Sequence, residues 1–123
     1  MSSRKVMVES YFEGFRQSDH GRILGLLTDN VVWDLPGFKH LEGKEAFDGE
    51  IENPAFEGSP KLAIDRLVEE GDTVVAVGTG EGRHKEAGPF RFAYCDVFTF
   101  AGDLISRVES YVVPVGDDSP SAS

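Results

Sequence analysis

The sequence predicts an α+β fold, in which a curved antiparallel sheet folds around a long N-terminal helix. Near the N-terminus, apolar residues recur at helical spacing; from residue 60 onward they alternate with polar residues, as in β-strands. A chain of 123 residues is long enough to form one domain with its own core. We therefore expect a single domain over residues 1–113 and a mobile C-terminal tail over residues 114–123.

Three segments have the pattern of helices. The first covers residues 4–18 and is amphipathic, because its apolar residues recur three and four positions apart: Met7, Val8, Tyr11, Phe12 and Phe15. A second, shorter helix is predicted in residues 18–30, with Ser18 or Asp19 as its N-cap and its end near Asn30. A brief third helix is predicted over residues 44–53, just before Pro54.

The remaining elements have the pattern of strands. Residues 31–35 form a short β-branched and aromatic run that ends at Pro36 and Gly37. Four longer alternating runs follow at residues 61–70, 72–84, 89–100 and 103–114. Short turn segments separate these runs, so they predict an antiparallel meander. Such a sheet can leave an apolar hollow beside the first helix.

Composition and charge narrow the range of partners. With 22 acidic residues against 12 basic ones, the formal charge of −10 disfavours nucleic acids and anionic membranes. No apolar run approaches the roughly 20 residues of a membrane span. The single cysteine, Cys95, allows no internal disulfide and suits the cytoplasm. The acidic charge also favours a small neutral or apolar ligand. The three histidines lack the spacing of a metal site, so we expect no metal.

One carboxyl group lies on an aromatic strand face. Counting by twos along residues 90–100 places Asp96 on the same face as five aromatic residues: Phe90, Phe92, Tyr94, Phe98 and Phe100. Burial there favours the neutral acid and raises its pKa. Two further polar groups share otherwise apolar faces, Tyr11 on the first helix and Asp34 on the strand at residues 31–35.

These three groups suggest acid–base chemistry. A protonated Asp96 beside the Tyr11 hydroxyl can bind a carbonyl oxygen and stabilise the charge that forms on it. Asp34, as an ionised carboxylate, would remove a proton from the adjacent carbon. Four aromatic residues are predicted to line the pocket, with His40 near its mouth as an auxiliary acid–base group: Phe38, Phe92, Tyr94 and Phe98. This chemistry needs no cofactor.

The order of these residues resembles a known group of proteins. Tyr11 in ESYFEGF, Asp34 in VVWDLPG and Asp96 in AYCDVFTF are similar to the ketosteroid isomerases and the wider nuclear transport factor 2-like superfamily, which includes the SnoaL-like polyketide cyclases. The resemblance implies a cone-shaped α+β barrel with a deep pocket, often dimeric through the outer face of its sheet. It also implies that Asp34 is the general base, and that Tyr11 and a protonated Asp96 form the oxyanion hole, as is known for ketosteroid isomerase.

The sequence leaves alternatives open. If Ala101 and Gly102 form a two-residue turn, Asp96 lies opposite Arg107, and an ion pair would keep the acid ionised. Asp34 has a structural alternative too, as a cap for the turn that follows it. With both acids engaged in this way, the protein would be a non-catalytic module for small-molecule binding or dimerisation on the same fold.

Overall fold

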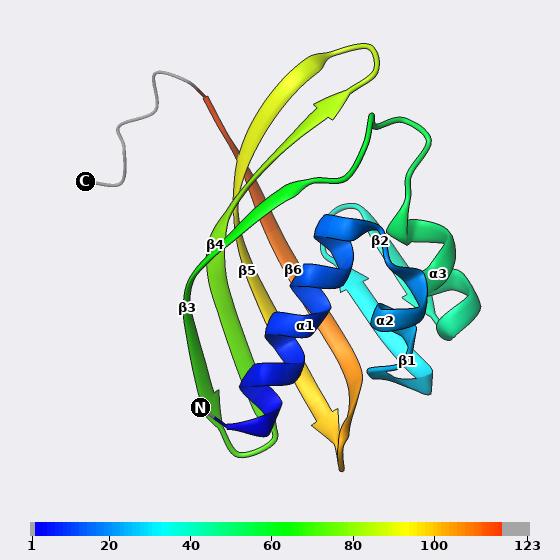
Figure 1. Ribbon diagram of the computed structural model, residues 1–123, viewed down its shortest axis with the longest axis vertical. Helices are drawn as coiled ribbons and strands as arrows, with labels where there is room; N and C mark the ends of the chain where they lie inside the picture. The colour runs from blue at the N-terminus through cyan, green and yellow to red at the C-terminus, as the bar shows by residue number, and fades with distance from the viewer. Residues whose placement is uncertain (1, 117–123) are drawn as a thin grey trace.

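The computed structural model describes residues 2–116 and confirms the α+β fold (Figure 1). The three helices are α1 (Ser3–Gln17), α2 (His20–Leu24) and α3 (Lys44–Ile51). The strands are β1 (Leu27–Leu35), β2 (Lys39–Glu42), β3 (Lys61–Glu70), β4 (Thr73–His84), β5 (Gly88–Ala101) and β6 (Leu104–Val115). They form one six-stranded sheet in the order β2-β1-β6-β5-β4-β3.

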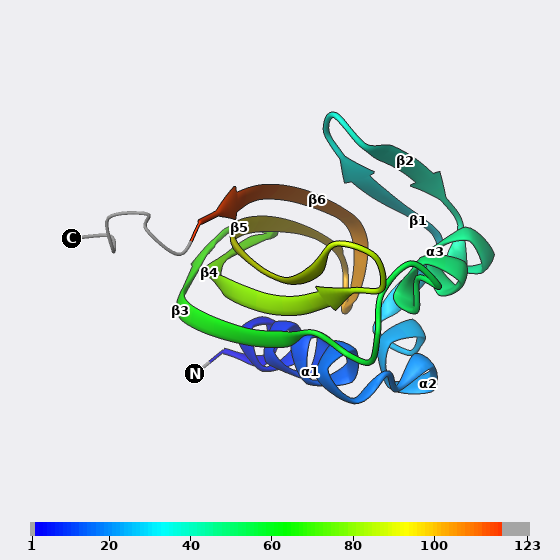
Figure 2. The same cartoon turned by 90° about the horizontal axis from the view of Figure 1, so that it is seen from above.

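The sheet is mixed and open rather than fully antiparallel. β1 pairs with β6 in parallel, whereas every other neighbouring pair in the sheet is antiparallel. The expectation of an antiparallel sheet therefore holds for β3 to β6 and is wrong for the junction between β1 and β6. Seen from above, the sheet curls so that α1 lies on its inner face (Figure 2). We call the opposite face, which is turned away from α1, the outer face.

The N-terminal elements differ from the sequence prediction at two places. α1 agrees with it, and the Ser2 side chain caps its first turn by accepting from the Lys5 N–H at 3.1 Å. α2 ends at Leu24, so the prediction of a helix to about Asn30 is wrong. The N–H of Ile105 donates to the carbonyl of Leu26 at 2.8 Å, which begins the pairing of β1 with β6 and draws the chain into the sheet. The short strand β2 was not predicted.

The C-terminal part agrees closely with the predicted strands. β6 ends at Val115, so the sheet extends past the predicted domain boundary at residue 113. The predicted mobile tail falls mostly on residues 117–123, outside the described residues. Among the described residues, no helix is both long and apolar enough to cross a membrane.

Aromatic side chains fill the space between α1 and the inner face. The ring centroid of Tyr11 lies 4.9 Å from that of Phe98, and Phe12 stacks on Tyr94 at 5.3 Å. On the side of β1, Trp33 stacks on Phe47 at 4.4 Å. Burying each such side chain stabilises the fold by about 1.5–3 kcal/mol. This aromatic core fixes the position of α1 against β5 and thereby shapes the interior of the cone.

Candidate functional site

A largely apolar cavity of about 750 Å³ lies beside the aromatic core. Its lining comes from α1, β1, the end of α3, the segment 52–60, and the parts of β4, β5 and β6 nearest that segment. Five aromatic side chains contribute to it: Phe15, Trp33, Phe56, Phe90 and Phe92. A space of this size and lining suits a small ring compound.

Two of these rings pack directly against glycines of β4. A Cβ atom at Gly80 would lie 2.2 Å from the Phe92 ring, and one at Gly82 would lie 2.8 Å from the Phe90 ring. Each ring therefore lies over the backbone of the neighbouring strand, where a larger residue would displace it. The glycine-rich run of β4 serves the cavity wall and is not a phosphate-binding loop.

The segment 52–60 forms one wall of the cavity and is tied to β4. The N–H of Glu57 donates to the carbonyl of Arg83 at 2.8 Å, and the N–H of Lys85 donates to that of Ala55 at 2.9 Å. The Phe56 ring lies 5.5 Å from the Phe90 ring. These contacts hold the segment in place although it has no regular secondary structure beyond one isolated bridge, from Phe56 to His84.

Asp96 is buried on the inner face of β5, as the sequence predicted. It is 7% exposed and lies opposite Ser110 of β6, which is 5% exposed. Burial raises the pKa of Asp96 to about 7, and hydrogen bonding by Ser110 partly offsets that increase. Near neutral pH, the carboxyl group is therefore present in both its acid and its ionised form.

Ser110 also connects Asp96 to the cavity wall. The indole Nε1–H of Trp33 donates to Ser110 Oγ at 2.9 Å. Because an indole N–H can only donate, the proton of the serine hydroxyl stays available for an oxygen of Asp96 across the strand pair. Trp33 lines the cavity, so one hydroxyl group joins the cavity wall to the buried acid.

Tyr11 lies in the same interior. It is 2% exposed, and its pKa is raised well above the ordinary value, first by burial and then by the negative charge of Asp96. Its hydroxyl therefore keeps its proton at any physiological pH and remains a hydrogen-bond donor. Asp96 therefore lies close enough to Tyr11 to influence its pKa, but neither residue lines the cavity, so the predicted convergence of the two groups on the cavity is not seen.

The predicted lining residues separate into two groups. Phe92 lines the cavity. Tyr94 and Phe98 belong to the buried core below it, and the Tyr94 hydroxyl donates to the carbonyl of Ala63 at 2.8 Å. Phe38 is 72% exposed beyond the end of β1, away from the cavity, so its predicted place in the lining is wrong.

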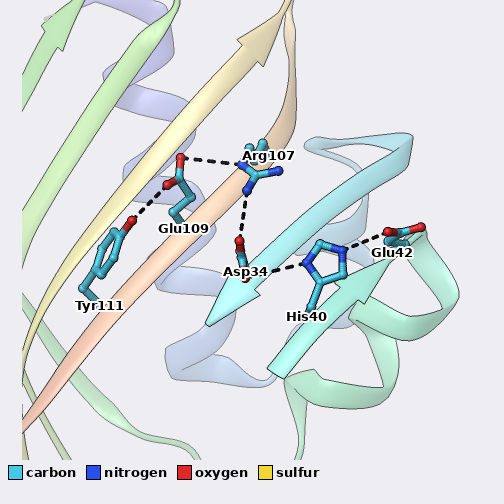
Figure 3. Close-up of polar contacts among 6 residues, drawn as sticks. All are labelled: Asp34, His40, Glu42, Arg107, Glu109 and Tyr111. Carbon is cyan, nitrogen blue, oxygen red and sulfur yellow. Dashed lines mark hydrogen bonds and ion pairs between the residues drawn. The ribbon is translucent and has the colours of Figure 1, made fainter. Parts of the chain in front are cut away.

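Asp34 does not join Tyr11 and Asp96. Neighbouring residues of a strand face opposite ways, and Trp33 takes the inner face of β1, so the Asp34 side chain lies on the outer face. There it accepts a hydrogen bond from Arg107 Nη2 at 3.0 Å (Figure 3). The sequence-based expectation that Asp34 faces the other two across the pocket is therefore not met. His40 also lies on the outer face, with its Nδ1 3.6 Å from Asp34.

The alternative ion pair between Asp96 and Arg107 does not form either. A bulge at Ser106 of β6 shifts the register, because Phe100 pairs with Ile105 and Thr99 with Arg107, so Arg107 lies opposite Thr99 on the outer face. It pairs with Asp34 and approaches Glu109, with 3.6 Å between Arg107 Nε and Glu109 Oε1. Among residues 2–116, Asp96 therefore has no cationic partner.

Six polar residues form what we call the outer-face network (Figure 3): Asp34, His40, Glu42, Arg107, Glu109 and Tyr111. His40 Nε2 lies 2.8 Å from Glu42, and this contact, followed by the one with Asp34, raises the pKa of His40. The Tyr111 hydroxyl donates to Glu109 at 3.0 Å. Exposed pairs of this kind contribute little to stability, because water and salt screen them. The network ties β2, β1 and β6 together and has no contact with the cavity.

Comparison with known proteins identifies the family to which this architecture belongs. A family model described as a SnoaL-like domain matches residues 8–108. The chain belongs to this family. The SnoaL-like fold is also that of the nuclear transport factor 2-like superfamily, as the sequence resemblance implied. A search of the curated proteins found no match.

Solved structures similar to this SnoaL-like protein carry several functional names. An NTF2-like protein of unknown function from Burkholderia pseudomallei has a TM-score of 0.81 at 20% identity, covering 89% of this chain and 90% of that one. A putative polyketide cyclase from Xanthomonas campestris has a TM-score of 0.78 at 23% identity, covering 89% and 92%. An epoxide hydrolase from M. tuberculosis has a TM-score of 0.75 at 18% identity, covering 87% and 80%. At these identities the likeness shows the fold alone.

No sequence pattern pointed directly to the hydrogen bond between Trp33 and Ser110. One signal was present, because Ile105 and Val108 are both apolar but three positions apart, which breaks the alternation of a regular strand. A bulge inserted there puts Ser110 on the inner face opposite Asp96, as the structure has it.

Proposed function

We propose that this SnoaL-like protein binds a small, mostly apolar carbonyl compound in the cavity and catalyses proton transfer next to the carbonyl group. One observation carries the proposal: an aromatic cavity of about 750 Å³ adjoins, through Trp33 and Ser110, a buried acid whose pKa is about 7. An acid with a pKa near the working pH can both accept and return a proton efficiently. The reaction would need no cofactor.

The residues take the following roles. Asp96 removes the proton from the carbon next to the carbonyl and returns it elsewhere, while Tyr11 donates a hydrogen bond to the carbonyl oxygen as charge develops there. Ser110 orients the Asp96 carboxyl group. We assign the role of general base to Asp96 rather than to Asp34, because Asp34 is hydrogen-bonded to Arg107 on the outer face. Because neither Asp96 nor Tyr11 lines the cavity, this proposal requires the aromatic side chains beside Trp33 to move and admit the carbonyl end of the ligand.

Isotope exchange tests the proposal. Deuterium uptake at the α-carbon of a panel of cyclic ketones is followed by NMR with the wild-type protein, Asp96→Asn and Asp34→Asn. We expect exchange above the buffer rate in the wild type, its loss in Asp96→Asn, and its retention in Asp34→Asn, which makes the same chemical change on the other face. Loss in Asp34→Asn with retention in Asp96→Asn would refute the assignment and restore Asp34 as the base.

A non-catalytic binding module is the second candidate. It is favoured by the absence of a second carboxylate beside Asp96 in the described interior, since Asp34 lies outside it. Saturable quenching of Trp33 fluorescence by a ketone that shows no exchange would support this function instead. Trp33 is the only tryptophan of the chain, so its signal reports on the cavity directly.

We also propose that the protein forms a homodimer in the cytoplasm, through the outer face. Apolar side chains lie next to one another there on β4, β5 and β6: Val75, Val77, Val97, Tyr111 and Val113. Val113 is 60% exposed and Tyr111 43%. We expect the wild type to sediment as a dimer and Val113→Asp to sediment as a monomer. A wild type that stays monomeric over a 100-fold range of protein concentration would refute the proposal.

A further inference from the structure

The charged residues that line the cavity are all acidic. They are Glu50, Glu52 and Glu57, and no lysine, arginine or histidine of the described chain takes part in the lining. The remaining lining is aromatic, aliphatic or uncharged. Carboxylates are therefore the only full charges in the lining itself.

The three glutamates mark the mouth rather than the interior. The side chains of Glu52 and Glu57 are 60% and 54% exposed, whereas that of Glu50 is 21% exposed. The first two belong to the segment 52–60, and Glu50 lies in the last turn of α3. The cavity thus changes along its length, from a rim of carboxylates in contact with water to an interior of aromatic rings such as Phe15 and Trp33.

Basic residues contact these glutamates without lining the cavity. Lys39 Nζ lies 2.7 Å from Glu50, and the amide of Asn53 takes its other oxygen at 3.4 Å, so this carboxylate is fully engaged. Arg83 Nε lies 3.6 Å from Glu57, and His20 Nε2 lies 3.3 Å from Glu52. Because the side chains of Glu52 and Glu57 are more than half exposed and a carboxylate has several lone pairs, both groups can still accept from a ligand.

From this polarity we infer that the ligand of the cavity is an amphipathic cation, with an apolar body in the aromatic interior and an ammonium group at the rim. The inference rests on the proposed function and names the class of compound that the same cavity takes. A cation at the rim keeps part of its hydration, is attracted by Glu52 and Glu57, and lies against Phe56, whose ring face favours positive charge. An anion at the same place would lose hydration and be repelled.

A matched set of ligands tests the inference with the wild-type protein. The probes are 5-phenylpentylamine, 5-phenylpentanol and 5-phenylpentanoate, which share one apolar body and differ in the charge of the end group. Binding is measured at pH 8 and low salt by calorimetry and by Trp33 fluorescence. We expect the amine to bind about tenfold more tightly than the alcohol, and the carboxylate more weakly than either, with the preference for the amine decreasing as salt rises.

Variants that remove the charges of Glu52 and Glu57 test whether these residues cause the preference for the amine. In the double variant Glu52→Gln with Glu57→Gln, the affinity for the amine should fall to within about twofold of that for the alcohol, whose own affinity should not change. Glu70→Gln, an exposed position at the end of β3 outside the cavity lining, makes the same kind of change elsewhere and should keep the preference for the amine.

Two kinds of failure are distinguishable. Equal binding of amine and alcohol, tighter binding of the carboxylate, or an amine preference that survives in the double variant overturns this inference and leaves apolar binding in the cavity intact. If none of the three probes binds but a cyclic ketone of the exchange panel does, this inference alone fails; if neither the probes nor the ketones bind, the proposed function is refuted as well.

Discussion

Replacing Ser110 with alanine should raise the pKa of Asp96. Ser110 stabilises the ionised form of the Asp96 carboxyl group by hydrogen bonding, and no basic side chain in the described structure pairs with that group. A hydrogen bond to a charged group contributes about 1.5–3 kcal/mol, and one pKa unit corresponds to about 1.4 kcal/mol. The substitution should therefore move the pKa of Asp96 from about 7 upward by about one to two units.

The assay is a pH titration of the carboxyl carbon of Asp96 by ¹³C NMR, with the resonance assigned by comparison with Asp96→Asn. Ser106→Ala provides the matched control, because Ser106 lies on the same strand and donates to the carbonyl of Thr99 at 3.1 Å on the way to the turn. It should leave the pKa of Asp96 within about 0.3 units of the wild type. An unchanged or lower pKa in Ser110→Ala would show that this hydroxyl does not stabilise the carboxylate, and the proposed role of Ser110 would fall.

Two further predictions concern stability. The pKa of Asp96 in the folded state lies above its unfolded value of 3.8, so the folded state binds the proton more tightly than the unfolded state. The free energy of unfolding should therefore fall by up to about 4 kcal/mol as the pH rises from about 4 to about 7. Urea unfolding across this range should show that Asp96→Asn removes this part of the slope; identical slopes in both proteins would contradict the burial argument. Gly80→Ala should destabilise the fold by about 1–3 kcal/mol, because its Cβ would lie 2.2 Å from the Phe92 ring, and it should also weaken ligand binding at that ring. Gly49→Ala, where nothing lies within 4 Å, is the control, and equal stability of the two variants would count against the tight packing of β4 on Phe92.

Local sequence patterns predicted most of the fold. The alternation from residue 61 onward located β3 to β6 almost to the residue, because each of these strands has one buried and one exposed face. The N-terminal region was harder. Leu24, Leu26 and Leu27 fit a helix as well as a strand, and the choice depended on a hydrogen bond from Ile105, far along the chain.

The candidate site, too, could be predicted only where local sequence patterns decide the orientation of a side chain. The aromatic face around Asp96 follows from strand alternation alone, and so does the opposite orientation of Trp33 and Asp34. Which of those two faces inward depended on the parallel pairing of β1 with β6, which no local pattern specifies. The partner of Arg107 likewise depended on the bulge at Ser106 of β6, where one extra residue reverses the face that each later side chain of the strand takes.

The strand order also constrains how the chain can assemble. β6, which follows the other five described strands in the chain, lies between β1 and β5 and separates the two halves of the sheet. Until residues 104–115 emerge from the ribosome, β1 and β2 share no sheet edge with β3, β4 and β5, and Trp33 has no hydroxyl to receive its N–H. Contacts between such distant segments close slowly. The sheet therefore cannot close without β6, and a change that delays the docking of β6 should leave the edges of β1 and β5 exposed to aggregation together.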